Sequence, residues 1–158
     1  MDEQMKLQRA REIFSSFCHV LDVNDWHYNK NAEELTIGCG VQGDDLPIEI
    51  AVQVDVDRQV VLLLSEICVI EEDKRVDAAV AVSAINNLLV NGSFDYDIGS
   101  GKIWFRMTNS FMESVLGYGV FEYMLYCSCQ TIDEYNDRLL MLSKGLLSFE
   151  QFFSASEE

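Results

Sequence analysis

Two adjacent apolar segments with the period of a β-strand constrain this fold most strongly. Isoleucine or valine occupies every second position from Ile48 to Val54, a pattern typical of a strand with one buried face and one wetter face. The polar segment DVDR (55–58) then provides a turn, and VVLLLSEICVI (60–70) is apolar on both faces at first. We therefore predict a mostly antiparallel sheet in which residues 60–70 form a central strand.

An amphipathic helix precedes these strands. Between this helix and residue 48, short alternating segments at residues 26–28 and 35–39 indicate further strand structure. The helix is predicted over residues 2–22, because apolar residues recur there at steps of three and four. These residues are Leu7, Ala10, Phe14, Phe17 and Leu21.

The segment SFDYDIGSGKIWFRM is predicted to form a β-hairpin. A two-residue turn at Ser100-Gly101 keeps the apolar residues of both strands on one face and places Asp95 opposite Arg106. A three-residue loop would break this alternation, so we prefer the two-residue turn.

The C-terminal part of the chain has helical periodicity. Thr131 with Glu134 is a capping-box pattern, so a long helix either continues through this point or restarts there. Gly145 is a typical helix end, and Ser148 with Gln151 caps a short final helix. The long stripe consists of Val120, Met124, Ile132, Tyr135, Leu139 and Leu142.

These elements predict an α+β fold in one domain, residues 1–158. A further helix at residues 72–91, ending at Asn91-Gly92, completes the order α-β-β-β-α-β-β-α, with a single antiparallel sheet of about five strands. With 158 residues, of which 49% are hydrophobic, the chain is suited to one compact core rather than two.

The charge of the chain argues against two classes of partner. Asp and Glu total 27 against 11 Lys and Arg, a formal net charge of -16. Such a field repels phosphate backbones and anionic lipid, so we expect binding to neither nucleic acid nor membrane. The first residues lack the apolar segment of a signal peptide, and five scattered cysteines do not suggest a disulfide framework. We therefore expect a cytoplasmic protein.

The segment GCGVQG (38–43) has the glycine spacing of a dinucleotide-binding loop. Such a loop needs a helix after it, because the helix N-terminus approaches the pyrophosphate. Here Asp44, Asp45 and an alternating strand follow instead. The glycines are better explained by a strand end and a hairpin turn, and we expect no cofactor.

Other motifs also lack the residues that their chemistry needs. Asp95-x-Asp97-x-Gly99 resembles the start of a calcium loop, but the later ligand positions do not match. Cys127-x-Cys129 lies in a helical pattern, where residues two apart point about 200° from each other and cannot share one zinc ion. We predict no metal site.

The two histidines, His19 and His27, do not indicate catalysis. Neither has an obvious nucleophile beside it in the sequence. We predict no catalytic residues.

Trp104 is the most informative exposed residue that the pattern predicts. It falls on the polar face of the hairpin, beside Asp95, Asp97 and Arg106. An aromatic side chain there needs cover from a helix, a second subunit or a ligand. These four residues form our candidate partner-binding surface.

The stretch AINNLLVNGSFDYDIGSGKIWFRM, with the later DEYNDRLLMLSKG, resembles the YbjN-like family. The resemblance covers about residues 5–146 and rests on Asn86 and Asn87 at a helix end, the hairpin, and the tail from Tyr135 to Gly145. Members are bacterial proteins labelled as sensory-transduction regulators, and their fold is similar to that of type III secretion chaperones. The resemblance implies no catalytic motif, and secretion chaperones of this shape are typically small, acidic and dimeric.

We therefore expect a non-catalytic, chaperone-like or regulatory module that binds a protein partner and forms a homodimer. The alternative is a small-molecule-binding sensory domain, with a pocket between the sheet and the long C-terminal helix. A flat apolar patch would favour the first and a pocket lined by convergent polar groups the second.

Overall fold

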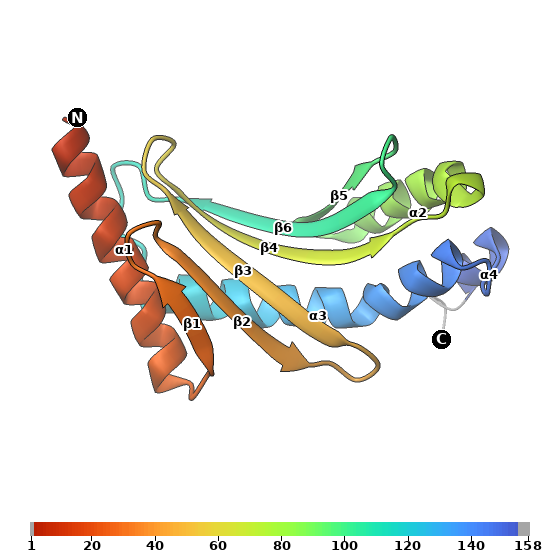
Figure 1. Ribbon diagram of the computed structural model, residues 1–158, viewed down its shortest axis with the longest axis horizontal. Coiled ribbons are helices and arrows are strands. Elements are labelled where there is room, and N and C mark those ends of the chain that lie inside the picture. Colours follow the sequence, from red (N-terminus) through yellow and green to blue (C-terminus); the bar gives the residue numbers. More distant parts are fainter. Residues whose placement is uncertain (1, 155–158) are drawn as a thin grey trace.

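The computed structural model describes residues 2–154 and contains one six-stranded antiparallel sheet (Figure 1). The spatial order is β1-β2-β3-β4-β6-β5, so β4 lies in the interior of the sheet, as predicted. The predicted α+β class with a single antiparallel sheet is confirmed. The strands are β1 (Tyr28–Asn31), β2 (Thr36–Gln42), β3 (Pro47–Asp55), β4 (Val60–Val69), β5 (Ser93–Asp97) and β6 (Lys102–Ser110).

The sheet has one strand more than the five or so expected. The alternating segments around Tyr28 and Cys39 are two paired strands, β1 and β2, rather than one. A tight turn joins them, in which the side chain of Asn31 accepts hydrogen bonds from the backbone N–H groups of Glu33 and Glu34. Four strands therefore precede the second helix.

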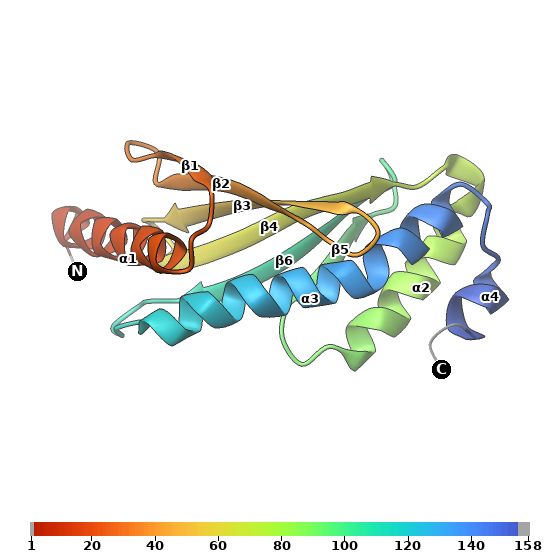
Figure 2. The same cartoon turned by 90° about the horizontal axis from the view of Figure 1, so that it is seen from below.

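The helices pack on one face of the sheet (Figure 2). The long helix α3 runs beneath β3, β4 and β6, α1 lies across one end against α3 and β3, and α2 packs on β5. A 3-10 turn, η1, leads into α2. The helical elements are α1 (Glu3–Val23), η1 (Glu72–Lys74), α2 (Arg75–Leu88), α3 (Tyr118–Ser143) and α4 (Phe149–Ser154).

Aromatic residues link the sheet to the helices. The ring of Phe94 on β5 lies 5.2 Å from that of Phe105 on β6 and 5.9 Å from that of Tyr135 on α3. At the other end, the rings of Phe17 on α1 and Phe121 on α3 lie 5.0 Å apart. Burying one large apolar side chain contributes about 1.5–3 kcal/mol. These contacts therefore fix the helices on this face, and no helix within residues 2–154 covers the opposite face of the sheet.

The β5–β6 hairpin has a different register from the one predicted. Asp95 lies opposite Trp104, not opposite Arg106, because the turn contains four residues from Ile98 to Gly101. Gly101 has φ of 80°, and its N–H donates to the carbonyl of Asp97 at 2.8 Å. The shift is two residues, so each side chain still points to the predicted face.

Helix α2 ends at Leu88, three residues before the predicted end at Asn91. The side chain of Asn86 binds the backbone of Phe94 through its Nδ2 donor and its Oδ1 acceptor, at 2.9 and 2.8 Å. This contact draws the chain into β5 soon after the helix. Gly92, with φ of 77°, lies in the connecting loop instead of capping the helix.

Of the two alternatives for the C-terminal helical segment, the structure shows one continuous helix. α3 passes through Thr131 without restarting. It ends where Gly145, at φ of 69°, donates to the carbonyl of Leu142 at 3.1 Å. The predicted capping box of α4 is confirmed: Gln151 N–H donates to Ser148 Oγ at 3.1 Å, and Ser148 N–H donates to Gln151 Oε1 at 2.9 Å.

Candidate partner-binding surface

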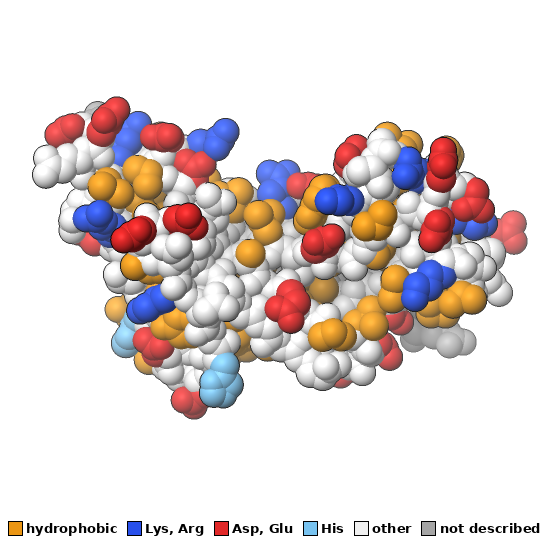
Figure 3. All heavy atoms as spheres, in the orientation of Figure 1, with side chains coloured by type: hydrophobic (Ala, Val, Ile, Leu, Met, Phe, Trp, Pro, Cys, Tyr) orange, Lys and Arg blue, Asp and Glu red, His pale blue; other side chains and the backbone are white. Residues whose placement is uncertain are grey.

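On the open face of the sheet, apolar side chains lie among polar and charged ones (Figure 3). Three of them, Leu62, Leu64 and Trp104, form what we call the apolar strip. Alternation sends Val61 and Leu63 into the core, so Leu62 and Leu64 on β4 point to the open face, where both are partly exposed. Trp104 on β6 points the same way and is also partly exposed. Within residues 2–154, no helix packs over these side chains.

Two rows of side chains cross the strip. Glu66, Trp104 and Asp95 are paired across β4, β6 and β5, while Leu64 and Arg106 form the next row. Residues directly opposite each other share a face of the sheet. Trp104 is therefore flanked by two carboxylates, and Lys102 Nζ lies 5.9 Å from the centre of its ring.

Asp95 and Arg106 form a diagonal ion pair beside Trp104. Arg106 Nε donates to Asp95 Oδ2 at 2.6 Å and Nη2 donates to Oδ1 at 3.3 Å. The hydrogen bond to Asp95 is the main reason why the pKa of Arg106 is raised. The side chains are 46% and 38% exposed, so the pair contributes at most about 1 kcal/mol to stability. Its main effect is to fix the orientation of two polar groups at the border of the apolar strip.

Asp97 is on the same face but does not join this group. Its carboxylate accepts hydrogen bonds from the hydroxyl of Ser100 at 2.6 Å and the N–H of Gly99 at 3.0 Å. These bonds, that of Ser100 first, lower the pKa of Asp97. Of the four predicted residues, the structure thus brings together Trp104, Arg106 and Asp95, while Asp97 organises the turn.

The glycine-rich segment has a structural explanation. Gly38 and Gly40 lie within β2, and the N–H of Gly43 donates to the carbonyl of Leu46 at 3.0 Å in the turn to β3. A Cβ atom at position 43 would lie 2.6 Å from that carbonyl oxygen and would also meet the carboxylate of Asp133. Strand and turn therefore account for the three glycines, as the sequence indicated.

The cysteines and histidines do not form a site in the described chain. No group of three or more His, Cys, Asp or Glu residues within 2–154 is arranged to hold a metal ion. All five cysteines are free, and burial raises the pKa of Cys39, Cys68 and Cys129 to about 11. The ring of His19 packs against that of Tyr118, with 5.0 Å between their centres.

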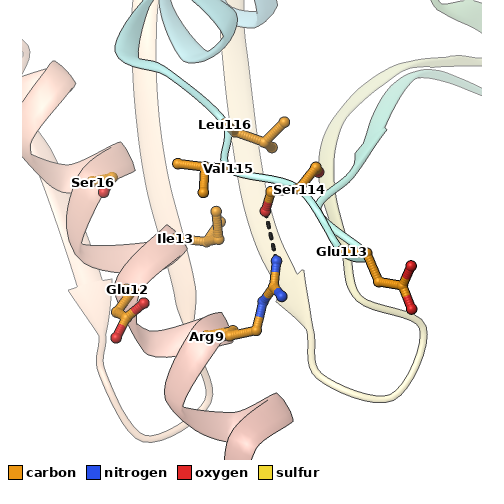
Figure 4. Close-up of a pocket in the computed structure, with 8 residues that line it drawn as sticks. All are labelled: Arg9, Glu12, Ile13, Ser16, Glu113, Ser114, Val115 and Leu116. Carbon is orange, nitrogen blue, oxygen red and sulfur yellow. Dashed lines mark hydrogen bonds between the residues drawn. The ribbon is translucent and has the colours of Figure 1, made fainter. Parts of the chain in front are cut away.

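A groove between α1 and the loop after β6 was not foreseen from the sequence (Figure 4). Its volume is about 480 Å³, and α1 contributes Arg9, Glu12, Ile13 and Ser16. The loop contributes residues 113–116. Arg9 and Phe111 are about 100 positions apart, so no local pattern could have brought them together. The one available signal was a set of apolar residues without a period in FMESVLGY (111–118).

The outer side of α2 is a second apolar surface. Val76 and Val80 are 71% and 48% exposed. They line a shallow hollow together with small or neutral side chains of α2 and with Ile98 from the β5–β6 turn. None of the described residues that line this hollow is charged, although the chain as a whole is strongly acidic.

The space between the sheet and α3 is filled by side chains. Phe121, Met124, Leu125, Ile132 and Leu139 of α3 are all essentially inaccessible to solvent. Ser128, the polar residue in their midst, is also buried, and its hydroxyl lies 3.9 Å from the sulfur of Met107. This is a packed core rather than a cavity with convergent polar groups.

Several solved structures share this fold. YbjN from E. coli, described as a candidate transcription regulator, has a TM-score of 0.58 at 13% identity over 78% of this chain and 87% of its own. The ExsC–ExsE complex gives 0.58 at 14%, over 81% of this chain and 93% of that one. The HopA1–SchA chaperone–effector complex gives 0.57 at 11%, over 87% and 98%.

The expected similarity to YbjN and to type III secretion chaperone folds is therefore confirmed at the level of the fold. No protein-family model and no curated protein sequence matches the chain. A separate observation concerns membranes: none of the helices within residues 2–154 combines the length and apolar character that crossing a bilayer requires.

Proposed function

We propose that this chain is a non-catalytic protein-binding module of the chaperone-like or regulatory kind, acting in the cytoplasm. The observation that carries the proposal is the open sheet face, where Leu62, Leu64 and Trp104 form an apolar strip with no described helix over it. Two of the structures with the same fold are complexes with a protein partner, ExsC with ExsE and HopA1 with SchA, which supports this proposal.

The strip has the composition of a small protein interface. Tryptophan is among the residues that contribute most to binding when a partner buries them, and charged groups around such a centre select the partner. Here Glu66 and the Asp95–Arg106 pair border Trp104. The net charge of -16 favours basic partners and repels acidic ones.

The alternative function, a small-molecule-binding sensory domain, requires a pocket between the sheet and α3. Buried side chains of α3 such as Met124 and Leu125 occupy that space. We therefore prefer the protein-binding function.

The proposal is tested by capturing a partner from cells of the source organism on the immobilised protein, with mass spectrometry of what binds. Wild type is compared with Trp104→Ala and with Tyr123→Ala, which removes another exposed aromatic residue from the outer side of α3. We expect a partner that is lost with Trp104→Ala and kept with Tyr123→Ala. Equal capture by both variants would exclude the open face as its binding site.

We further propose that the module is a homodimer formed through the outer side of α2. A chain of charge -16 repels its own copies, so a surface without charge is where two copies meet at least cost. Sedimentation at low and high salt should show a dimer that persists or tightens with salt, and Val80→Glu should give a monomer. A wild-type monomer at tens of micromolar under both conditions would disprove the dimer.

We also propose that residues 1–158 act as one domain, since the sheet and the three longer helices contribute to one buried core. Unfolding curves followed by tryptophan fluorescence and by far-UV circular dichroism should then coincide. Two separate transitions would indicate two units.

A further inference from the structure

We propose that the groove between α1 and the loop after β6 binds a short basic segment of the protein partner that carries an apolar anchor. We call it the Arg9 groove and define it by Arg9, Glu12, Ile13 and Ser16 of α1 and by residues 113–116. The inference rests on the proposed function, because it assumes a protein partner. It adds a second contact region, on a different part of the molecule from Trp104.

The groove is large enough for a few side chains. From Arg9 to Ser16 the helix rises about 10 Å, or two turns, and the volume of about 480 Å³ is within the range of ligand sites. Ile13 is buried at its base, while Val115 and Leu116 approach from the loop (Figure 4). An apolar side chain placed there would contact apolar groups from both walls.

The loop presents more apolar surface than its own packing uses. Val115, which lines the groove, is 93% exposed, and Met112 in the same loop is also exposed. Scattered apolar residues are normal on a protein surface, but Val115 and Leu116 lie together on one wall of a groove opposite Ile13, which is typical of an interaction site.

The charges at the groove favour a basic segment. Glu12 stands on the α1 wall and Glu113 on the loop wall, where its carboxylate points outward at the rim of the groove (Figure 4). Arg9 Nη2 is engaged by two backbone carbonyls, at 2.8 Å from Phe111 O and 2.6 Å from Ser114 O. Two carboxylates against one guanidinium leave the lining residues with a net negative charge. Lysine or arginine residues on either side of an apolar anchor would complement these carboxylates.

The same contacts hold the groove in shape before a partner arrives. Arg9 ties the loop to α1, and the buried Phe111 donates its N–H to the carbonyl of Gln59 at 2.9 Å. A preformed site loses less conformational entropy on binding than a mobile loop would. The loop is therefore suited to bind a segment without rearranging.

The test uses two synthetic peptides of about nine residues, KKSLVLSKK and its glutamate counterpart EESLVLSEE, titrated into the ¹⁵N-labelled protein. We expect the lysine peptide to bind with Kd below about 1 mM and to shift the backbone resonances of Ser16, Ser114 and Leu116. The glutamate peptide should leave them unchanged. No binding of either peptide, or equal binding of both, would overturn the proposal.

Variants locate the binding. Reversing both rim charges in Glu12→Lys/Glu113→Lys should weaken the lysine peptide by about fivefold to tenfold, because each exposed charge pair contributes up to about 1 kcal/mol. Glu33→Lys/Glu34→Lys makes the same change of charge in the β1–β2 turn and should have a much smaller effect. An equal loss in both variants would show a general effect of net charge and would refute the groove.

A further pair of variants separates this inference from the proposed function. Ser16→Phe should fill the groove and abolish peptide binding, whereas Trp104→Ala should retain it. Loss of peptide binding in Trp104→Ala would place the peptide on the open face and refute the groove. If the peptide fails to bind while Trp104→Ala still loses the cellular partner, only the groove is wrong.

Discussion

Removing the side chain of Asn86 should destabilise the protein more than any other change at an exposed or half-exposed asparagine. Its amide binds both backbone groups of Phe94, at 2.8 and 2.9 Å, on the side of β5 that faces away from β6. Phe94 is 2% exposed, so water does not readily replace the amide. Asn86→Ala therefore leaves a backbone donor and a backbone acceptor without partners in a largely buried place.

The cost follows from these two bonds. Leaving a buried backbone donor or acceptor without its partner costs about 1–3 kcal/mol, and because Asn86 is only half-buried we take about 1.5 kcal/mol for each of the two groups. The better helix propensity of alanine offsets roughly 0.5 kcal/mol. We expect a net loss of about 2–3 kcal/mol. With a urea m-value of about 2 kcal/mol/M, the midpoint should fall by about 1–1.5 M.

Urea denaturation followed by far-UV circular dichroism measures this shift, and the chain provides its own control. Asn87 is the next residue on α2 and is exposed, so Asn87→Ala should change stability by less than about 0.5 kcal/mol. Asn86→Asp keeps an acceptor for the Phe94 N–H but loses the donor, and should lie between wild type and Asn86→Ala. Equal midpoints for Asn86→Ala and Asn87→Ala would refute the reasoning.

Three further expectations concern thiols, nucleotides and acid. Burial raises the pKa of Cys39, Cys68 and Cys129 to about 11, so Ellman's reagent at pH 8 should label these three thiols only after unfolding. Because all five cysteines are free, dithiothreitol should leave the melting temperature unchanged. A fall of several degrees would contradict the free thiols. NAD, FAD and ATP at about 1 mM should produce no thermal shift, since a strand follows the glycine-rich segment; a saturable stabilisation by any of them would refute that interpretation. The pKa of Asp55 is held below its ordinary value of 3.8, chiefly by the backbone N–H of Arg58. Asp55 thus stabilises the fold above pH 3.8, and this contribution is lost as the pH falls through the folded pKa. The urea midpoint of Asp55→Asn should accordingly be below that of wild type at pH 6 and approach it at pH 2.5; a constant gap would contradict this assignment.

Local patterns were sufficient for the elements whose signals lie within a few residues. The alternation from Ile48 to Val54 and the capping box of Ser148 with Gln151 depend only on neighbours in sequence, and both are confirmed. The alternation also placed Trp104 on the open face of its hairpin. A register shift of two residues preserves the face of each side chain, so that assignment did not depend on the correct turn.

Long-range contacts decided the features that were missed. The end of α2 depends on the hydrogen bonds between Asn86 and Phe94, and the sequence of the helix itself gives no signal for this end. That Leu64 lies beside Trp104 depends on β4 pairing with β6, a choice of strand neighbours that periodicity cannot make. The Arg9 groove requires α1 to meet the segment after β6, which no local pattern specifies.

The bond between Asn86 and Phe94 also affects how copies of this protein meet. A sheet with an apolar open face can add strands of other molecules at its two edges and grow into fibrils. At β5 the outward backbone groups of Phe94 are already bound by a side chain of the same molecule. At the opposite edge of the sheet, β1 has only four residues, and three of them are exposed and polar. Association is thereby directed to faces and helices, where it stops at a defined number of subunits, and away from strand addition, which has no natural limit.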